Sequence, residues 1–367
     1  MALPGRATPE GTARFRDRAV RERALPFEHF RDTPGRLSLS SLGLGTYLGT
    51  PDGPTDLAVE QAATVCLASG RVNVLDTAIN YRHQRAERSV GRALARAVAR
   101  GTVAREEVFV ATKVGYLTPD GDAGPPLAGW IERELLEPGV LAEADLADGC
   151  HAMSPSFLRH ELGRSLANLG VETVDLLYLH NAPDAQLPAV GRERFLERLE
   201  AAFAACEGFR AEGTIAAYGL ATWDCLRVPP GHPSHFSIEA AVRLARKVGG
   251  ADPGLRFLQL PFNLAMPEGW SAATQPLRGE RHGALRVAHR LGLGTFTSVP
   301  LAQGRLARAG PRRAGLSAAQ TAVQFARSAP GTIGPLVGLK RPEHLAETLE
   351  LAARRPWDEA TFAGCLS

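Results

Sequence analysis

The feature that most constrains the fold is a regular alternation of short apolar segments with amphipathic stretches from residue 36 onward. The strand-like segments are 37–45, 71–76, 107–113, 173–180, 214–222, 256–262, 293–299 and 332–339. The stretches between them read as helices, and several stop at a glycine that suits a helix C-terminus: Gly70, Gly170 and Gly213. Eight strand-then-helix units in series predict an α/β protein, a parallel (β/α)8 TIM barrel.

A doubly wound open sheet is the alternative arrangement of such units. That fold places a glycine-rich G-x-G-x-x-G turn directly between the first strand and the first helix. Residues 43–49, GLGTYLG, contain glycines but lead into PDGPT rather than straight into a helix. The sequence therefore favours the barrel.

We divide the chain of 367 residues into an N-terminal arm (1–35), the barrel (36–355) with a long loop at 114–153, and a C-terminal tail (356–367). Two interpretations of the arm remain open: a flap lying on the barrel, or a partly disordered leader. The long loop follows a strand, at the barrel face where active sites lie. Its apolar side chains and the breaks at Gly124 and Pro125–Pro126 predict a lid over the barrel mouth, with outside packing as the alternative.

Composition limits the class of partner. The 42 basic and 39 acidic residues are interspersed and leave a net charge of +3, which gives no indication of nucleic-acid binding. The five cysteines are scattered and include no C-x-x-C pair, so we expect a cytoplasmic protein without disulfides or bound metal. No run approaches the ~18 apolar residues that cross a bilayer, so we expect no membrane partner, and a monomer by default.

Ionisable side chains end three consecutive strands. Asp76 ends the second, with Tyr81 just beyond it, Lys113 ends the third and His180 ends the fourth. Because neighbouring parallel strands bring their carboxyl ends to one rim, we expect the four to meet there. The alternative is a purely structural Asp76–Lys113 ion pair, with His180 capping a loop and Tyr81 packing.

Together, such a set suits proton transfer to a carbonyl oxygen. A tyrosine is a weak acid at neutral pH, and a nearby ammonium group lowers its pKa towards the working range. Asp76 supplies the counter-charge that a buried Lys113 needs. His180 can donate a hydrogen bond that orients the substrate oxygen.

These segments, DTAINY (76–81), ERSVGRAL (87–94), FVATK (109–113) and DLLYLHN (175–181), resemble the active-site motifs of the aldo-keto reductases. The similarity runs in order from about residue 37 to 352 and is strongest to a bacterial group with GCHAMSP (149–155) and YLHNAPD (178–184). It implies NADPH-dependent reduction of an aldehyde or ketone. Tyr81 would be the general acid, Lys113 would tune it, Asp76 would hold Lys113, and His180 would orient the carbonyl.

The resemblance also implies a set of cofactor-binding positions. They are Thr46, Tyr47, Thr222, Gln259, Ser298, Leu301, Gln303, Gly338, Lys340, Arg341, His344, Glu347 and Thr348. Lys340 and Arg341 precede a predicted helix, where an anion is favoured, so we expect NADPH over NADH. A solvated basic turn is the alternative.

Three positions depart from the family pattern. Ala221-Thr222 replaces the usual Ser-Asn, Thr348 replaces the asparagine that reads adenine, and Ser298 replaces the aromatic that stacks on the nicotinamide. Phe296 lies two residues earlier on the same strand face. Two other functions therefore stay open: a redox-neutral dehydratase- or epimerase-like enzyme on the same scaffold, and a catalytically silent binding subunit.

Aromatic residues in the loops after the strands predict the walls of a substrate pocket. They are Tyr47, Tyr116, Trp130 and Trp223, with Trp270 nearby. They would suit a carbonyl substrate larger than a simple sugar aldehyde. Loop aromatics that merely pin the loops to the barrel are the alternative.

Overall fold

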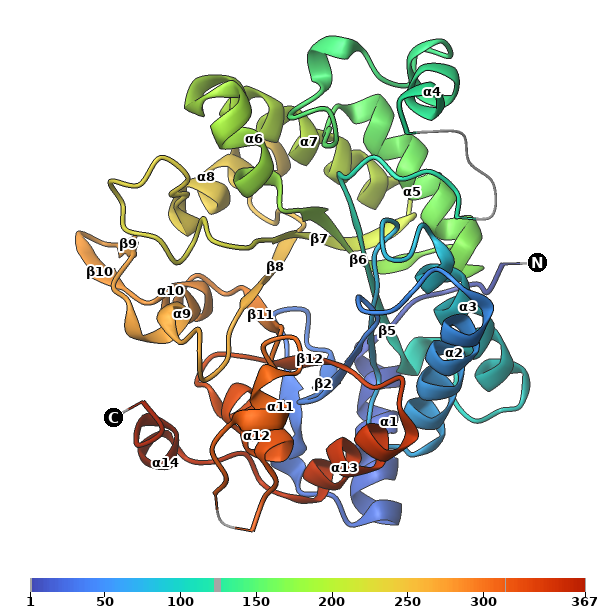
Figure 1. Cartoon of the computed structure of the whole chain (residues 1–367), viewed down its shortest axis with the longest axis vertical. Helices are drawn as coiled ribbons and strands as arrows, with labels where there is room; N and C mark the ends of the chain where they lie inside the picture. The colour runs from blue at the N-terminus through green and yellow to red at the C-terminus, as the bar shows by residue number, and fades with distance from the viewer. Residues whose placement is uncertain (1, 122–126, 314, 367) are drawn as a thin grey trace.

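The computed structural model describes residues 2–121, 127–313 and 315–366. Eight parallel strands close into a barrel in the order β11-β12-β3-β4-β5-β6-β7-β8, which confirms the predicted (β/α)8 fold (Figure 1). Their bounds are β3 Gly43–Gly45, β4 Val74–Asp76, β5 Phe109–Val114, β6 Val174–His180, β7 Ile215–Ala221, β8 Leu255–Pro261, β11 Gly294–Ser298 and β12 Gly334–Gly338.

Helices surround the barrel. The main helix after each barrel strand is, in chain order, α2 Gly53–Ala68, α3 Arg85–Ala99, α5 Pro155–Leu169, α7 Arg192–Ala211, α8 Ile238–Gly249, α10 Ala284–Arg290, α12 Ala318–Ser328 and α13 Pro342–Glu350. Side chains cap several of them at the N-terminus. Asp52 accepts from the Thr55 amide at 2.8 Å ahead of α2, and Ser317 and Gln320 form a reciprocal capping box ahead of α12. These caps fix where each helix starts and so where the loops at the barrel mouth end.

Further helices, strands and turns fill the connections. They are β1 Phe30–Asp32, β2 Ser38–Ser40, α4 Leu127–Ile131, a π-helix at Glu132–Leu136, α6 Ala182–Val190, α9 Glu268–Ser271, β9 Gln275–Leu277, β10 Glu280–His282, α11 Arg305–Ala309 and α14 Glu359–Ala363, with 3₁₀ turns at Phe27–His29, Arg105–Glu107, Glu143–Asp145 and Leu351–Ala353. Within the described residues, no helix is long and apolar enough to cross a membrane.

The predicted first strand, 37–45, is two strands rather than one. Residues Ser38–Ser40 pair antiparallel with β1, and only Gly43–Gly45 joins the barrel. The break lies where the Ser40 hydroxyl donates to the Leu42 carbonyl at 2.7 Å, a local bond that competes with a continuous strand. The segment ahead of this hairpin contains helix α1 (Pro9–Arg23), whose Phe15 packs edge-on against Phe30.

Aromatic side chains fill the lower part of the barrel. Phe109, Phe257 and Phe296 lie within 5.4 to 6.1 Å of one another, centroid to centroid, and all are buried. Leu39 of the hairpin belongs to the same buried cluster. The barrel interior is therefore packed below its carboxyl-end rim, as this fold requires.

Residues 130–141 of the long loop pack against α5. Trp130, Leu135 and Leu141 form a separate small core with Phe157, and the Arg164 guanidinium lies 5.6 Å from the Trp130 ring centroid. Figure 1 shows α4 beside α5, on the outside of the barrel. Residues 130–141 therefore pack on the outside of the barrel, which was the alternative to the predicted lid. Gly124 and the Pro125–Pro126 pair lie outside the described residues.

Helix α5 buries a carboxylic acid, which gives a testable pH effect. Burial raises the pKa of Glu161 to about 8, with Arg164 opposing the rise and the neighbouring Glu87 adding to it. In the unfolded chain the proton leaves near pH 4.5, so the folded state holds one more proton between pH 4.5 and 8. The contribution of Glu161 to the free energy of unfolding therefore falls across that window, by up to about 1.4 kcal/mol per pH unit.

We expect Glu161→Gln to remove this loss, because an amide stays neutral. Urea unfolding at pH 5 and pH 8.5 should show a much smaller decrease for the variant than for the parent. Glu193→Gln, at an exposed position of α7, is the matched control and should keep the parent's slope. The same change in stability between these pH values in Glu161→Gln and in the parent would contradict the prediction.

Candidate active site

The ends of β4 and β5 hold a buried ion pair. The Lys113 ammonium donates to Asp76 Oδ1 at 2.6 Å and to the Thr77 carbonyl at 2.8 Å, and both side chains are buried. Gln259 on β8 donates to the other Asp76 oxygen at 3.4 Å. The parallel register of β4, β5 and β6 brings these strand ends together, as the sequence predicted.

Tyr81 lies between this pair and His180. The Lys113 ammonium is 4.6 Å from the Tyr81 ring centroid, and the Tyr81 and His180 rings meet edge to face at 5.8 Å. A third ring, that of Tyr47, lies 5.1 Å from Tyr81. The structure thus brings all four candidate catalytic residues together.

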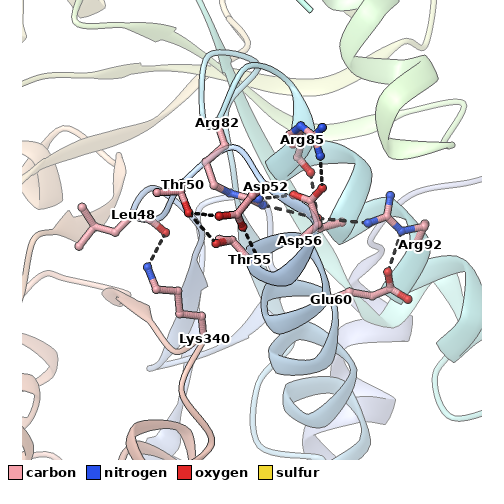
Figure 2. Close-up of polar contacts among 11 residues, drawn as sticks. Leu48, Thr50, Asp52, Thr55, Asp56, Glu60, Arg82, Arg85, Arg92 and Lys340 are labelled. Atoms are coloured by element: carbon pink, nitrogen blue, oxygen red, sulfur yellow. Dashed lines mark hydrogen bonds and ion pairs between the residues drawn. The ribbon is translucent and has the colours of Figure 1, made fainter. Parts of the chain in front are cut away.

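The loop that carries Tyr81 is held in an uncommon conformation. The three residues after it, 82–84, all have φ between 52° and 70°, the left-handed region that non-glycine residues rarely enter. Asp56 on α2 accepts from both Arg82 and Arg85, the latter at 2.6 Å (Figure 2). These ion pairs fix the loop to α2 and so hold the Tyr81 ring in place.

Burial sets the protonation states of the site. It would lower the pKa of Lys113, but the Asp76 carboxylate and the Tyr81 phenol raise that pKa above its usual value. Burial also raises the pKa of Tyr81, and Lys113 opposes that rise without reversing it. The expected net lowering of the Tyr81 pKa is therefore absent, because the pocket is buried. A neutral phenol beside a charged ammonium is the form that can donate a proton.

His180 presents its proton to the cavity. Burial lowers the pKa of His180 well below its usual range, so the ring is neutral. Its Nδ1 atom is buried and has no hydrogen-bond partner among the described residues. A proton on Nδ1 would be left unsatisfied, so the favoured tautomer carries it on Nε2.

A cavity of about 890 Å³ opens at this face of the barrel. Asp76, Tyr81 and His180 line it, whereas Lys113 lies behind them. Every predicted cofactor position also lines it: Thr46, Tyr47, Thr222, Gln259, Ser298, Leu301, Gln303, Gly338, Lys340, Arg341, His344, Glu347 and Thr348. Sequence reasoning missed Asn80, Asn181, Arg308 and Arg312, which line the same cavity.

Not every predicted pocket aromatic reaches the cavity. Tyr47, Tyr116 and Trp223 line it, and Trp223 is partly exposed there. Trp130 does not, because it is buried in the small core on α5. Trp270 packs edge-on against Phe362 of α14 at 5.4 Å. Phe296 does not substitute for the missing nicotinamide-stacking aromatic either, because it stacks on Phe257 inside the barrel.

Four basic side chains line the cavity. The Lys340 ammonium donates to the Leu48 carbonyl at 3.2 Å and so bridges the loop after β3 and the loop after β12 (Figure 2). Arg341, Arg308 and Arg312 are the other three. The signal for the two missed arginines was the run RLARAGPRR at 305–313, which sequence reasoning did not use.

Comparison with known proteins agrees with this geometry. Residues 41–229, more than half of the chain, match the aldo/keto reductase family. The chain is 28% identical over 194 residues to the NADH-specific methylglyoxal reductase of Escherichia coli (strain K12), an alignment covering 51% of the chain and 50% of that protein. The chain thus spans about half the length of the curated relative it matches.

Solved structures share the fold. An aldo/keto reductase of Klebsiella pneumoniae in complex with NADP and acetate has a TM-score of 0.57 at 16% identity, covering 92% of this chain and 94% of that one. The holo form of a Bacillus halodurans aldo-keto reductase has a TM-score of 0.58 at 17% identity, with the same two coverages. The chain belongs to the aldo/keto reductase family, as its sequence motifs indicated.

Proposed function

We propose that this protein reduces an aldehyde or ketone to an alcohol with NADPH, with Tyr81 as the general acid. The observation that carries the proposal is the set at the strand ends. A buried Asp76–Lys113 pair at 2.6 Å, with its ammonium 4.6 Å from the Tyr81 ring, lies at the wall of a large cavity. A silent barrel would have no need of a phenol, a charged ammonium and a neutral imidazole converging on one point.

The residues present fit a nicotinamide dinucleotide. Tyr81 and Lys340 line the same cavity, and Gly338 leaves space in its wall, since an added Cβ would meet nothing closer than 4.0 Å. Lys340 and Arg341 stand at the N-terminus of α13, a favourable place for a phosphate. Gln259 offers an amide beside Asp76. When bound, the cofactor supplies the hydride for the carbonyl carbon.

The protein's own groups then handle the proton and the orientation. His180 Nε2–H donates a hydrogen bond to the substrate oxygen and directs it towards Tyr81. The Tyr81 hydroxyl transfers its proton to that oxygen as negative charge develops on it. Lys113 stabilises the phenolate that remains, and Asp76 keeps Lys113 charged and in place.

The experiment that tests the proposal measures the ratio of NADPH oxidised to alcohol formed. Incubation with NADPH and a panel of aldehydes and ketones should oxidise one NADPH for each alcohol formed. Isomerised or dehydrated product with no net change in NADPH would instead support the redox-neutral alternative.

Cofactor choice is a second prediction. The 2′-phosphate of NADPH carries negative charge that NADH lacks, so we expect NADPH to bind more tightly and Lys340→Ala to lose about tenfold or more of that preference. Lys247→Ala, at an exposed ion pair with Glu200, is the matched control. Fluorescence titration gives the dissociation constants of NADPH and NADH for each protein and so measures this preference. Equal values for the two cofactors in the unmutated protein would contradict the prediction, and tighter binding of NADH would match the specificity named for the Escherichia coli relative.

We further infer a single functional unit, residues 36–355, acting as a cytoplasmic monomer. Support comes from the five cysteines, all free, of which Cys66, Cys206 and Cys225 are buried. Thiols in this state suit a reducing compartment. Sedimentation analysis of the purified protein tests the monomer, and a stable dimer would contradict it.

A further inference from the structure

A buried histidine outside the cavity contacts the main chain of His180. His151, in the GCHAMSP segment, is fully buried, and its Nε2 lies 2.8 Å from the His180 carbonyl oxygen. Its other nitrogen, Nδ1, lies 2.9 Å from Gln186 Nε2 on α6. The Tyr116 ring meets both imidazoles edge to face at 5.1 Å. The proposed mechanism gives this histidine no role.

Arg198 fixes the direction of these hydrogen bonds. Its guanidinium on α7 donates to Gln186 Oε1 at 2.6 Å and to the main-chain carbonyl oxygens of Ala144 and Asp145. Because Gln186 Oε1 accepts from Arg198, the amide nitrogen must face His151 and donate to Nδ1. His151 then carries its single proton on Nε2 and donates it to the His180 carbonyl. Burial lowers the pKa of His151 to about 4, in keeping with a neutral ring.

The backbone around His151 is shaped to admit the ring. Gly115, directly after β5, has φ of +139°, and an added Cβ would lie 2.7 Å from His151 Nε2. The Gly115 carbonyl accepts from the Ala152 amide at 2.9 Å, so the segment around His151 runs along the end of β5. A larger residue at position 115 would displace the imidazole from the His180 carbonyl.

We propose that His151 is a positioning residue for His180 and Tyr116, through which the outer segment 144–153 and helices α6 and α7 set the geometry of the carbonyl site. The inference rests on the proposed function and deepens it. The Tyr116 hydroxyl accepts from the Asn181 side chain at 3.2 Å, so the same contacts place the aromatic wall and the orienting imidazole relative to each other. His151 touches neither substrate nor cofactor and acts only through these neighbours.

The kinetic test compares replacements that keep or remove the two hydrogen bonds. His151→Phe fills the space but can neither donate nor accept, so kcat should fall about 10- to 100-fold, as small misplacements in an active site do. The Kd for NADPH should stay within about threefold of the parent value, because the defect lies in the transition state. His151→Gln retains a donor and an acceptor and should recover most of the activity.

Two further variants separate positioning from mere folding. His235→Phe removes another buried histidine, whose Nε2 lies 3.0 Å from the Thr274 carbonyl away from the cavity, and should leave kcat unchanged. Gly115→Ala keeps His151 in the sequence but should reproduce the kcat defect by displacing its ring. Equal kcat losses in His151→Phe and His235→Phe, or full activity in His151→Phe, would overturn the proposal.

Gln186→Glu adds a pH readout that a structural role would not move. A carboxylate at position 186 should raise the pKa of His151. Once the ring is neutral, its remaining proton should lie on Nδ1, where the carboxylate accepts it as a hydrogen bond. Nε2 then has no proton to donate to the His180 carbonyl. The other titratable or charged groups around the ring are Arg198, Tyr116 and His180. We expect kcat of this variant to fall with rising pH along a limb that the parent lacks. A parent-like pH profile counts against the proposal.

A measurement without turnover keeps this proposal distinct from the proposed function. Two-dimensional ¹H–¹⁵N spectra of histidine-labelled protein report which ring nitrogen is protonated, and His151→Phe assigns the signals. We expect the Nε2–H tautomer for His151, and a His180 ring signal that shifts in His151→Phe but not in His235→Phe. If the protein oxidises no NADPH, the reductase function fails while this result still stands. An Nδ1–H tautomer at His151 overturns the positioning role whatever the activity.

Discussion

Tyr81→Phe is expected to leave the Kd for NADPH unchanged and to lower kcat by about 100-fold or more, because general acid catalysis contributes ~10²–10⁴-fold. The substitution removes a hydroxyl and keeps the ring, so the edge-to-face contact with His180 at 5.8 Å and the contact with Tyr47 at 5.1 Å remain. Any loss of turnover is then a loss of the proton donor. Stopped-flow oxidation of NADPH with a saturating aldehyde measures it.

Tyr47→Phe is the control for loss of a phenol at the same cavity wall. Tyr47 is more than half exposed and contacts Tyr81 by its ring, so we expect its hydroxyl to take no part in the proton transfer. We expect a change in KM for the carbonyl and little change in kcat. Turnover of Tyr81→Phe within tenfold of the parent on a good substrate would show that another group donates the proton.

The Asp76–Lys113 pair should show strong energetic coupling. Removing one member of a buried ion pair strands the other charge, which typically costs about 3–5 kcal/mol. We therefore expect Asp76→Asn and Lys113→Met each to lose roughly that much unfolding free energy. The double variant should lose clearly less than the sum, because no uncompensated charge remains. All three variants should lose kcat, since each lacks the charged Lys113 in its place beside Tyr81.

Urea denaturation of the four proteins gives the coupling energy directly. Additive losses would mean that Lys113 and Asp76 do not stabilise each other, and would also remove the basis for a charged lysine beside Tyr81. The Arg105–Asp175 pair, also buried and 2.9 Å apart, is a useful comparison. It lies outside the cavity, so breaking it should cost stability without selectively lowering kcat in the protein that remains folded.

The sequence predicted the barrel and the four residues at its rim because both follow from local pattern. Apolar runs with the length of strands, separated by helices, allow few topologies, and the carboxyl ends of neighbouring parallel strands must lie together. Asp76, Lys113 and His180 each end such a run, so their proximity required no knowledge of side-chain packing. The cofactor positions came from the resemblance, and they all line the cavity.

Features that depend on tertiary packing could not be predicted in this way. Trp130 was expected at the pocket because its loop follows a strand, but the apolar face of α5 buries it instead. The break between Ser40 and Gly43 depends on a side-chain hydrogen bond. The contacts of His151 join residues 35 and 29 positions apart in the sequence, so no local pattern indicates them. The pKa of Tyr81 depends on how much protein surrounds it.

The packed interior of the barrel has a consequence for the order of events in turnover. Phe109, Phe257 and Phe296 fill the barrel beneath the cavity, so whatever binds beside Asp76 and Gln259 enters and leaves through the cavity that Tyr47, Tyr116 and Trp223 also line. On the proposed function, we expect a carbonyl compound and the nicotinamide to share this route. We therefore expect ordered binding, in which the cofactor binds first and is released last. With the most reactive substrates, release of the cofactor should then limit the steady-state rate.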